Sequence, residues 1–197
     1  MRGLLIALEG LDQSGKQTQA EGLVDYFASI GRATHLLSFP DYTTAIGAEI
    51  SRALHGEREY AADTLQLLYV ANRYEHRQTI QALLAAGTVI VCDRYLASSI
   101  AYGEAQGLDA AWLAEIQRFL PRPDRTIVLD IAPETAVQRK STNRDRYERD
   151  LALLSRVRES YRRQSEQPDW IHLNGERPKQ DVSADVITAV STLLGQP

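Results

Sequence analysis

The residues that follow the first apolar segment have the types and spacing of a phosphate-binding loop. Gly10 and Gly15 enclose four residues and Lys16 follows at once, which is the pattern G-x-x-x-x-G-K. The glycines let the backbone curl so that successive N–H groups face one centre, and the next helix directs its positive end there. The lysine then reaches the β and γ phosphates. The predicted phosphate-binding residues are Gly10, Leu11, Asp12, Gln13, Ser14, Gly15, Lys16, Gln17 and Thr18.

Gln17 departs from the full motif, in which a Ser or Thr hydroxyl at this position ligates Mg²⁺. A carboxamide oxygen can ligate a hard cation, but it is longer and more mobile than a hydroxyl. Two interpretations stay open. Either Gln17 ligates Mg²⁺ directly or through water, or the ion is held mainly by phosphates and another carboxylate.

Asp12 is unexpected inside a loop that binds phosphates, because a carboxylate is repelled by them. A carboxylate that points away and accepts a hydrogen bond from a sugar hydroxyl would avoid this repulsion, and it would indicate a second, sugar-bearing ligand near the loop. The alternative is an aspartate that forms a turn and faces solvent.

Two further strand patterns end in an aspartate, Asp93 after residues 89–92 and Asp130 after residues 127–129. Open α/β sheets bind ligands at the carboxyl ends of their strands, where such a carboxylate can serve Mg²⁺. Asp93 is followed by Arg94, and an arginine there can grip a phosphate bidentately. Asp130 is followed by Ile131-Ala132-Pro133, which starts a helix. We therefore expect Asp93 to take part in the chemistry and Asp130 to be mainly structural.

Residues 139–149 (RKSTNRDRYER) form a basic stretch with five basic and two acidic side chains and no apolar core positions. Two interpretations fit this composition. The stretch is either a basic flap over the ligand edge of the sheet or a solvated charged loop.

Alternating strand and helix patterns must position these side chains. Continuous apolar runs predict strands over residues 4–8, 33–39, 88–92, 126–129 and 170–173. Apolar residues at helical spacing predict helices from Lys16 toward Gly31, over residues 46–54, and over 182–194. Asp63 and Gln66 resemble a capping box that opens a long helix toward Leu84. The pattern predicts an α/β fold with a five-stranded parallel sheet and helices on both faces.

Composition limits the kinds of protein to which the chain can belong. Its 197 residues carry 22 basic and 26 acidic side chains, a formal net charge of −4, and we expect one domain over 1–197. An acidic chain is not typical of a protein dedicated to duplex DNA. A single cysteine cannot form an internal disulfide, and no apolar run reaches the ~18 residues of a membrane span. We expect a cytoplasmic protein with no nucleic-acid or membrane partner.

Taken together, these motifs resemble the thymidylate kinase family, the P-loop kinases that phosphorylate dTMP. The resemblance covers nearly the whole chain, because five elements occur in the family's order and spacing. They are the loop with its acid at residue 12, Phe39-Pro40, Ala71-Asn72-Arg73, Asp93-Arg94-Tyr95 and the arginine-rich lid ending in Arg146-Tyr147-Glu148. The resemblance implies a three-layer P-loop NTPase fold with a basic lid over about 139–149.

The resemblance also implies roles for individual residues. Asp12 would bond the 3′-hydroxyl of dTMP, Arg94 would hold its phosphate with help from Tyr42, and Arg73 would bond a base carbonyl. Tyr69 would stack on the thymine and Tyr102 would exclude a 2′-hydroxyl, although without the resemblance both tyrosines read as core packing. The expected dTMP-binding residues are Asp12, Phe39, Tyr42, Tyr69, Arg73, Arg94, Ser99, Tyr102 and Tyr147.

By the same resemblance, a transition-state arginine comes from the loop or from the lid. The loop position is Gln13, so the lid must supply it. Arg144 is the first choice, and Arg139 or Arg149 is the alternative. Residues 174–178 are expected near the adenine. We expect Lys16, Arg94, Arg144 and Asp12 to be the catalytic residues, ATP and Mg²⁺ to be required, Asp93 and Gln17 to serve the metal, and the protein to be a homodimer. The alternatives are another nucleoside monophosphate or deoxynucleoside kinase, a P-loop ATPase that transfers nothing, and a nucleic-acid module built on 139–149.

Overall fold

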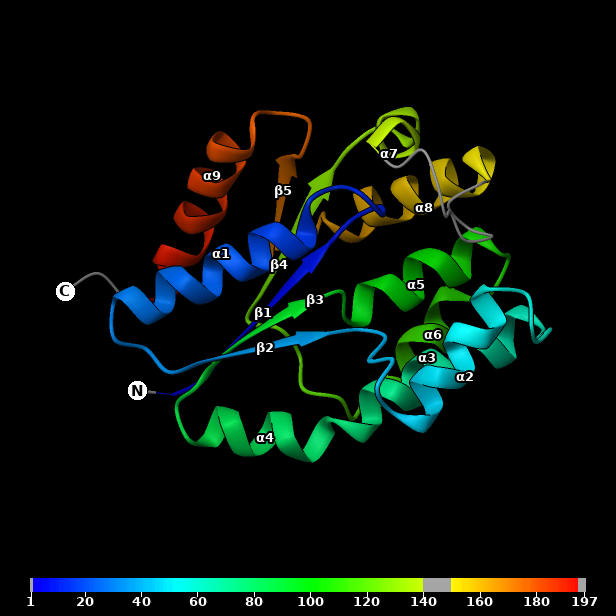
Figure 1. Cartoon of the computed structure of the whole chain (residues 1–197), viewed down its shortest axis with the longest axis horizontal. Helices are drawn as coiled ribbons and strands as arrows, with labels where there is room; N and C mark the ends of the chain where they lie inside the picture. Colours follow the sequence, from blue (N-terminus) through cyan, green and yellow to red (C-terminus); the bar gives the residue numbers. More distant parts are fainter. Residues whose placement is uncertain (1, 140–149, 195–197) are drawn as a thin grey trace.

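One parallel sheet organises the molecule. The computed structural model describes residues 2–139 and 150–194, and within them five strands form the order β2-β3-β1-β4-β5 (Figure 1). All strand pairs are parallel. The strands are β1 (Leu4–Glu9), β2 (Thr34–Ser38), β3 (Val89–Asp93), β4 (Arg125–Asp130) and β5 (Trp170–Asn174). The predicted α/β class and the five-stranded parallel sheet are confirmed.

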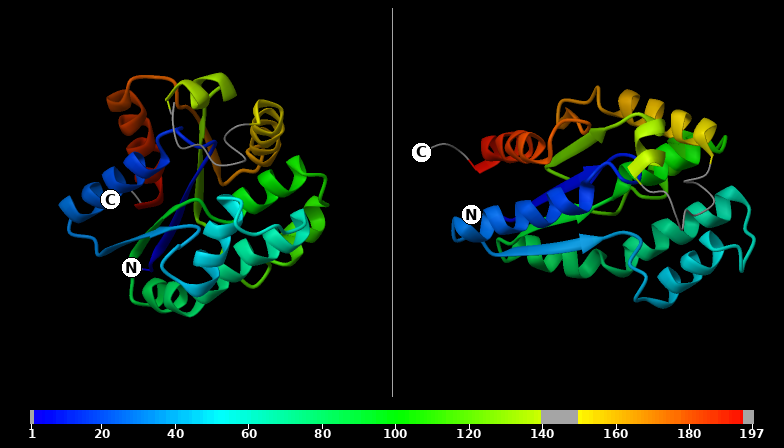
Figure 2. Two further views of the ribbon diagram at one scale, coloured as in Figure 1. Left: turned by 45° about the vertical axis from the view of Figure 1, so that its right-hand side comes forward. Right: turned by 45° about the horizontal axis from the view of Figure 1, so that its top comes forward.

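Helices cover both faces of the sheet because alternate side chains of the apolar strands point in opposite directions. Leu4, Ile6 and Leu8 pack with α1 (Lys16–Ser29) and α9 (Lys179–Ser191). Leu5 and Ala7 face the other side, where Ile80 of α4 (Arg77–Ala85) lies. The three layers are visible in Figure 1 and in the turned views of Figure 2.

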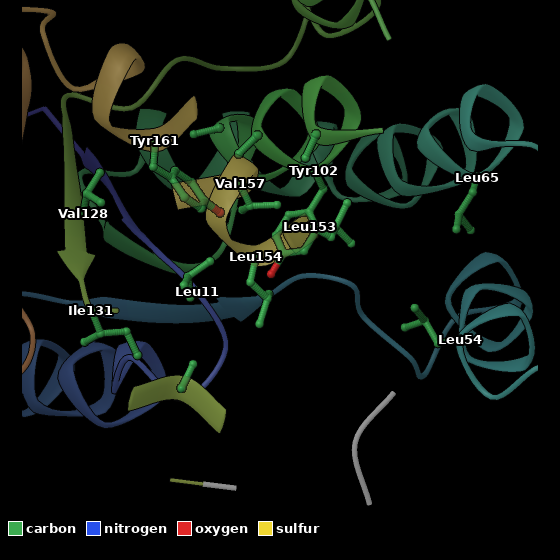
Figure 3. Close-up of a cluster of buried hydrophobic side chains, with 14 of the residues drawn as sticks. Leu11, Leu54, Leu65, Tyr102, Val128, Ile131, Leu153, Leu154, Val157 and Tyr161 are labelled. Carbon is green, nitrogen blue, oxygen red and sulfur yellow. The ribbon is translucent and has the colours of Figure 1, made fainter. Parts of the chain in front are cut away.

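A second packed region lies beyond the carboxyl ends of the strands. It joins α2 (Ala45–Leu54), α3 (Ala62–Glu75), α5 (Leu96–Ala105) and α8 (Leu151–Gln164). Figure 3 shows Tyr102 of α5 and Tyr161 of α8 among its apolar side chains. Leu11 of the phosphate loop is also part of this cluster and is 2% exposed. The loop is therefore anchored in a core, although it projects beyond the sheet.

The long helix predicted from Asp63 to Leu84 is wrong, because α3 ends at Glu75 and α4 begins at Arg77. His76 lies between them. Its ring packs edge-on against Phe39, with 5.4 Å between ring centroids, and its Nε2 lies 3.0 Å from a carboxylate oxygen of Asp41. These tertiary contacts break the helix at a residue that is neither glycine nor proline.

The predicted capping box is also wrong. The helix begins at Ala62, its N-cap Ala61 has no side-chain cap, and the Asp63 carboxylate accepts a hydrogen bond from the neighbouring Thr64 N–H instead. Gln66 does not reach back to the backbone; its side chain is buried, with 1% exposed.

Other elements differ in extent from the sequence pattern. The helix expected after Asp130 is confirmed as α7 (Pro133–Arg139), and the last helix starts at Lys179 rather than at 182 and ends in the 3₁₀ turn η1 (Thr192–Leu194). The prediction named no helices at α5, α8 or α6 (Ala110–Glu115). In the described part of the chain, no helix is both long enough and apolar enough to cross a bilayer.

Candidate active site

The phosphate loop extends from β1, the middle strand of the sheet. Gly10 has φ +135°, and a Cβ there would lie 2.5 Å from the carbonyl oxygen of Leu129 in β4, so only glycine fits. The Lys16 ammonium is buried and donates a hydrogen bond of 2.7 Å to the Leu11 carbonyl. Burial, with the positive charge of Arg94 nearby, lowers the pKa of Lys16 to about 8. The lysine is thus held in the loop, at the start of α1.

Arg94 lies next to this loop because β3 pairs with β1, with Asp93 opposite Leu8. Its backbone has φ +64° and its N–H donates to the Leu8 carbonyl at 2.9 Å. This left-handed conformation is uncommon for a residue with a side chain. It accompanies the sharp change of direction between β3 and α5.

Asp12 and Arg94 form an ion pair across the site. The Arg94 Nη2 donates to Asp12 Oδ1 at 2.7 Å, and the Tyr102 hydroxyl donates to Asp12 Oδ2 at 3.1 Å. Burial alone would raise the pKa of Asp12, but the charges of Arg94 and Lys16 hold it well below its usual range. Asp12 is therefore ionised and engaged, and it is not a turn residue that faces solvent.

The buried carboxylate of Glu9 shares two hydrogen-bond partners with Arg94, the hydroxyls of Ser98 and Tyr161. Glu9 is fully buried at the end of β1 and accepts hydrogen bonds from the Tyr95 N–H at 2.8 Å, the Ser98 hydroxyl at 2.6 Å and the Tyr161 hydroxyl at 3.2 Å. The Arg94 Nη1 donates to the same two hydroxyls, at 3.1 Å to Ser98 and 3.3 Å to Tyr161.

Sequence reasoning missed this hydrogen-bond network. The only signal for it was an acid at the end of an otherwise apolar strand, and nothing in the sequence marks Tyr161.

A cavity between α3 and α5, which we call the α3–α5 cavity, brings together the described residues that were expected to bind dTMP. Its lining comprises Asp12, Phe39, Pro40, Tyr42, Leu54, Gln66, Tyr69, Arg73, Arg94, Ser98, Ser99 and Tyr102. Within it, Arg73 Nη1 donates to the Ser99 hydroxyl at 2.7 Å, and the guanidinium lies over the Phe39 ring at 5.9 Å. Tyr102 belongs both to this lining and to the apolar core. Tyr147 lies outside the described residues.

A second cavity, the loop cavity, adjoins the first. It is lined by Asp12, Gln13, Gly15, Lys16, Gln17, Thr18, Ser38, Phe39, Pro40, Tyr42, Asp93 and Arg94. Asp12 and Arg94 line both cavities, so their ion pair lies where the two meet. The structure therefore brings most of the predicted phosphate-binding residues and the described acceptor-binding residues to two cavities that share part of their lining.

The loop cavity has features that suit a hard cation. Asp93 Oδ1 is buried and has no hydrogen-bond partner among the described residues, and Mg²⁺ prefers carboxylate oxygens. The Gln17 amide donates to Glu21 at 3.0 Å, which leaves its oxygen available. Among residues 2–139 and 150–194 there is no cluster of three or more acidic, histidine or cysteine side chains able to hold a metal ion. Substrate phosphates would have to supply the remaining ligands.

Asp130, the other aspartate at the end of a strand, forms ion pairs with arginines of α8. Arg158 of α8 donates two hydrogen bonds to it, at 2.6 and 2.9 Å, and Arg162 adds one at 2.9 Å. Burial would raise the pKa of Asp130, but these arginines lower it. Asp130 lines neither cavity, so it ties α8 to the end of β4, as expected of a mainly structural residue.

Arg139, the first residue of the basic stretch, reaches the other side of the phosphate loop. It donates to the carbonyls of Gln13 at 3.0 Å and Gly175 at 3.1 Å. Together with Gln13, Gly15 and Thr18 it lines a third cavity that extends to Gly175 and Arg177. The late loop expected near the adenine is thus adjacent to the phosphate loop. Arg144 and Arg149 lie outside the described residues.

Comparison with known proteins identifies the family to which this site belongs. The family model for thymidylate kinase matches residues 8–186. The chain belongs to the thymidylate kinase family. The predicted resemblance is thereby confirmed.

Individual members of the thymidylate kinase family match over most of the chain. A thymidylate kinase of Schizosaccharomyces pombe is 36% identical over 197 residues, which is 98% of this chain and 93% of that protein. One from Arabidopsis thaliana is 41% identical over 148 residues, which is 75% of this chain but only 56% of that longer protein. The solved thymidylate kinase of Candida albicans superimposes with a TM-score of 0.83 at 30% identity, covering 98% of this chain and 92% of that one.

Membership of the thymidylate kinase family assigns the activity: the chain is a nucleotide kinase that phosphorylates dTMP to dTDP. This confirms the predicted enzyme class and reaction over the alternatives of a P-loop ATPase and a nucleic-acid module.

Proposed function

We propose that ATP and dTMP bind with their phosphates facing each other in the joined loop and α3–α5 cavities, and that the γ-phosphoryl group passes in line to the dTMP phosphate. The observation that carries this proposal is the Asp12–Arg94 ion pair, which lies where the two cavities meet. The acceptor is an anionic phosphate oxygen, so no strong general base is needed. Catalysis then depends on positioning and charge neutralisation.

Two cations of the described site would neutralise the phosphates. Lys16 would bind the β and γ phosphates of ATP, exchanging its contact with the Leu11 carbonyl for them. Arg94 would hold the dTMP phosphate, and the hydroxyls of Ser98 and Tyr161 fix its orientation. Asp12 would both restrain Arg94 and accept a hydrogen bond from the 3′-hydroxyl of the sugar.

The α3–α5 cavity would hold the rest of dTMP. Tyr69 would stack on the thymine, Arg73 would bond a base carbonyl beside Ser99, and Tyr102 would lie against the deoxyribose where a ribose 2′-hydroxyl would clash. Phe39 and Tyr42 would close the phosphate side of this cavity, with Tyr147 contributing from the lid.

An arginine of the lid would stabilise the transferring phosphoryl group, because Gln13 has no positive charge to offer. We assign this role to Arg144, with Arg139 and Arg149 as the alternatives. Lid closure would exclude water and so limit hydrolysis of ATP.

Mg²⁺ would be held by Asp93, directly or through water, and by the carboxamide of Gln17. When bound, the ion supplies positive charge to the phosphates of ATP. The unpartnered Asp93 Oδ1 in the loop cavity supports this assignment. We further propose a cytoplasmic homodimer that has no nucleic-acid partner and supplies a step of dTTP synthesis.

A coupled assay for ADP release tests the proposed function. With ATP and Mg²⁺ present, dTMP should be the preferred acceptor in a panel that includes dUMP, dCMP, AMP and thymidine. Release of ADP at a rate that no acceptor changes would refute the proposal.

A further inference from the structure

Gln66 is a buried glutamine whose side-chain amide has no partner. Its side chain is 1% exposed, and neither Nε2 nor Oε1 makes a hydrogen bond within the part of the chain that the structure describes. An amide that is buried without partners costs free energy, and folded proteins pair the great majority of such groups. The capping role expected from the sequence does not explain it, because Gln66 caps nothing.

Gln66 is one of the residues that line the α3–α5 cavity, so its buried amide lies in the wall of that cavity. Gln66, Tyr69 and Arg73 are spaced i, i+3 and i+7, so they follow one face of α3. Arg73 also carries a buried, unpartnered donor, its Nε, while its Nη1 is occupied by Ser99 and the Tyr69 carbonyl. Two residues that line the same cavity from one helix face therefore carry unpartnered buried donors, and one of them also carries an unpartnered acceptor.

We propose that Gln66 is a specificity-determining residue that forms hydrogen bonds with the edge of the pyrimidine base. This inference rests on the proposed placement of dTMP. Thymine presents an N3–H donor between two carbonyl acceptors, and a carboxamide presents one acceptor beside one donor. Oε1 accepts from N3–H and Nε2 donates to a ring carbonyl. The side chain of Arg73 has donors only, so it requires a second carbonyl and disfavours the amino group of cytosine.

The apolar walls of the cavity strengthen this selectivity. Phe39, Pro40 and Leu54 also line the cavity, and their side chains cannot replace a missing hydrogen bond. A ligand that fails to pair with Gln66 leaves a buried donor and acceptor unsatisfied, and sites of this kind reject such ligands strongly. A base that does pair satisfies groups that the free protein leaves unpaired.

Gln66→Met is the test variant, because methionine matches the length of glutamine and removes both polar atoms. Leu67→Met is the matched control: Leu67 is the next residue of α3, is 46% exposed and does not line the cavity. In Gln66→Met we expect the KM for dTMP to rise about tenfold or more, with a smaller change in kcat. We expect the Tm to be unchanged or higher, since an unsatisfied buried amide has been removed. Leu67→Met should change neither constant.

N3-methyl-dTMP tests the same contact without depending on how a variant folds, since it lacks the N3–H. Wild-type enzyme should bind it at least tenfold more weakly than dTMP, and Gln66→Met should discriminate much less between the two. Equal KM values of the wild type for dTMP and N3-methyl-dTMP would overturn the proposal. So would an unchanged KM for dTMP in Gln66→Met.

A lower Tm together with an unchanged ratio of the two KM values would also overturn it, since that result describes a merely structural glutamine. Failure of the wild type to phosphorylate dTMP would instead refute the proposed function. Normal wild-type turnover with unaltered Gln66→Met kinetics would refute the role of Gln66 alone.

Discussion

Arg94 Nη2 lies 2.7 Å from Asp12 Oδ1, although the two residues are 82 positions apart in the chain. The pairing of β1 with β3 creates this contact, because it places the residues that follow the two strands side by side. The pair lines both cavities, and in the proposed complex it would lie between the donor and the acceptor phosphates.

Asp12→Asn should lower kcat/KM for dTMP by about 100-fold, because a misplaced Arg94 no longer positions the acceptor phosphate. Steady-state kinetics with dTMP as the varied substrate measure this. The KM for ATP should change much less, since Lys16 remains in place. An equal loss for both substrates would contradict the assignment of Asp12 to the acceptor side.

The pKa of about 8 for Lys16 gives ATP binding a pH dependence. Binding to phosphate needs the charged ammonium, so the affinity for ATP should fall as the pH rises through about 8, and ATP binding below that pH should not require proton uptake. For folding, the lowered pKa means that the unfolded chain binds more protons, so this group's contribution to stability rises with pH between about 8 and 10.5.

Lys16→Met is the control for this profile. Its kcat should fall by about 10³-fold. Its remaining affinity for ATP, measured by calorimetry from pH 7 to 9, should not show the fall with rising pH that the Lys16 ammonium causes in the wild type. A wild-type profile that is flat over this range would contradict the role of Lys16.

Asp93→Asn and Asp130→Asn should behave differently despite their similar positions at strand ends. Asp93→Asn should raise the Mg²⁺ concentration needed for half-maximal activity by about tenfold and leave the Tm nearly unchanged. Asp130→Asn should lower the free energy of unfolding by about 2 kcal/mol, because it weakens hydrogen bonds to Arg158 and Arg162. Mg²⁺ titrations and thermal melts separate the two effects, and an exchange of the phenotypes would contradict both assignments.

Tyr161→Phe should lower kcat/KM for dTMP by about tenfold, because Arg94 loses one of the hydroxyls that orient it. The phenyl ring keeps the packing of α8 in the core, so the Tm should fall only slightly. The KM for dTMP should rise and the KM for ATP should not. This difference would show that Tyr161 acts by positioning Arg94.

Arg144→Ala should lower kcat more than it raises the KM for dTMP, as expected of an arginine that acts on the transition state. Arg139→Ala is the comparison, because Arg139 holds the carbonyls of Gln13 and Gly175. If Arg139→Ala shows the larger loss of kcat and Arg144→Ala alters only KM, the roles of the two arginines are reversed.

The sheet and the phosphate loop could be predicted because their signals are local. A run of apolar residues identifies each buried strand, and the spacing of Gly10, Gly15 and Lys16 has few alternatives once a strand precedes it. The choice of Asp93 over Asp130 for the chemistry also came from local sequence, from the arginine that follows the first of them. Whether Asp93 holds Mg²⁺ stays a prediction.

Features that depend on contacts between distant segments could not be predicted. The break at His76 results from Phe39 and Asp41, which lie on another segment of the chain. No helix was predicted at α8, where Arg158 and Arg162 bond to Asp130 and Tyr161 packs in the core. Gln66 has the spacing of a capping residue, and only the packing of α3 against α5 shows that it is buried in a cavity.

The central strands also determine how the molecule can be labelled. Cys92, the single cysteine, is fully buried in β3, where burial raises the pKa of its thiol. Thiol reagents attack the exposed thiolate, so the native protein should resist them and should need no cysteine removed beforehand. A cysteine introduced at Phe119, which is 60% exposed, would then be the sole attachment point for a fluorophore or spin probe.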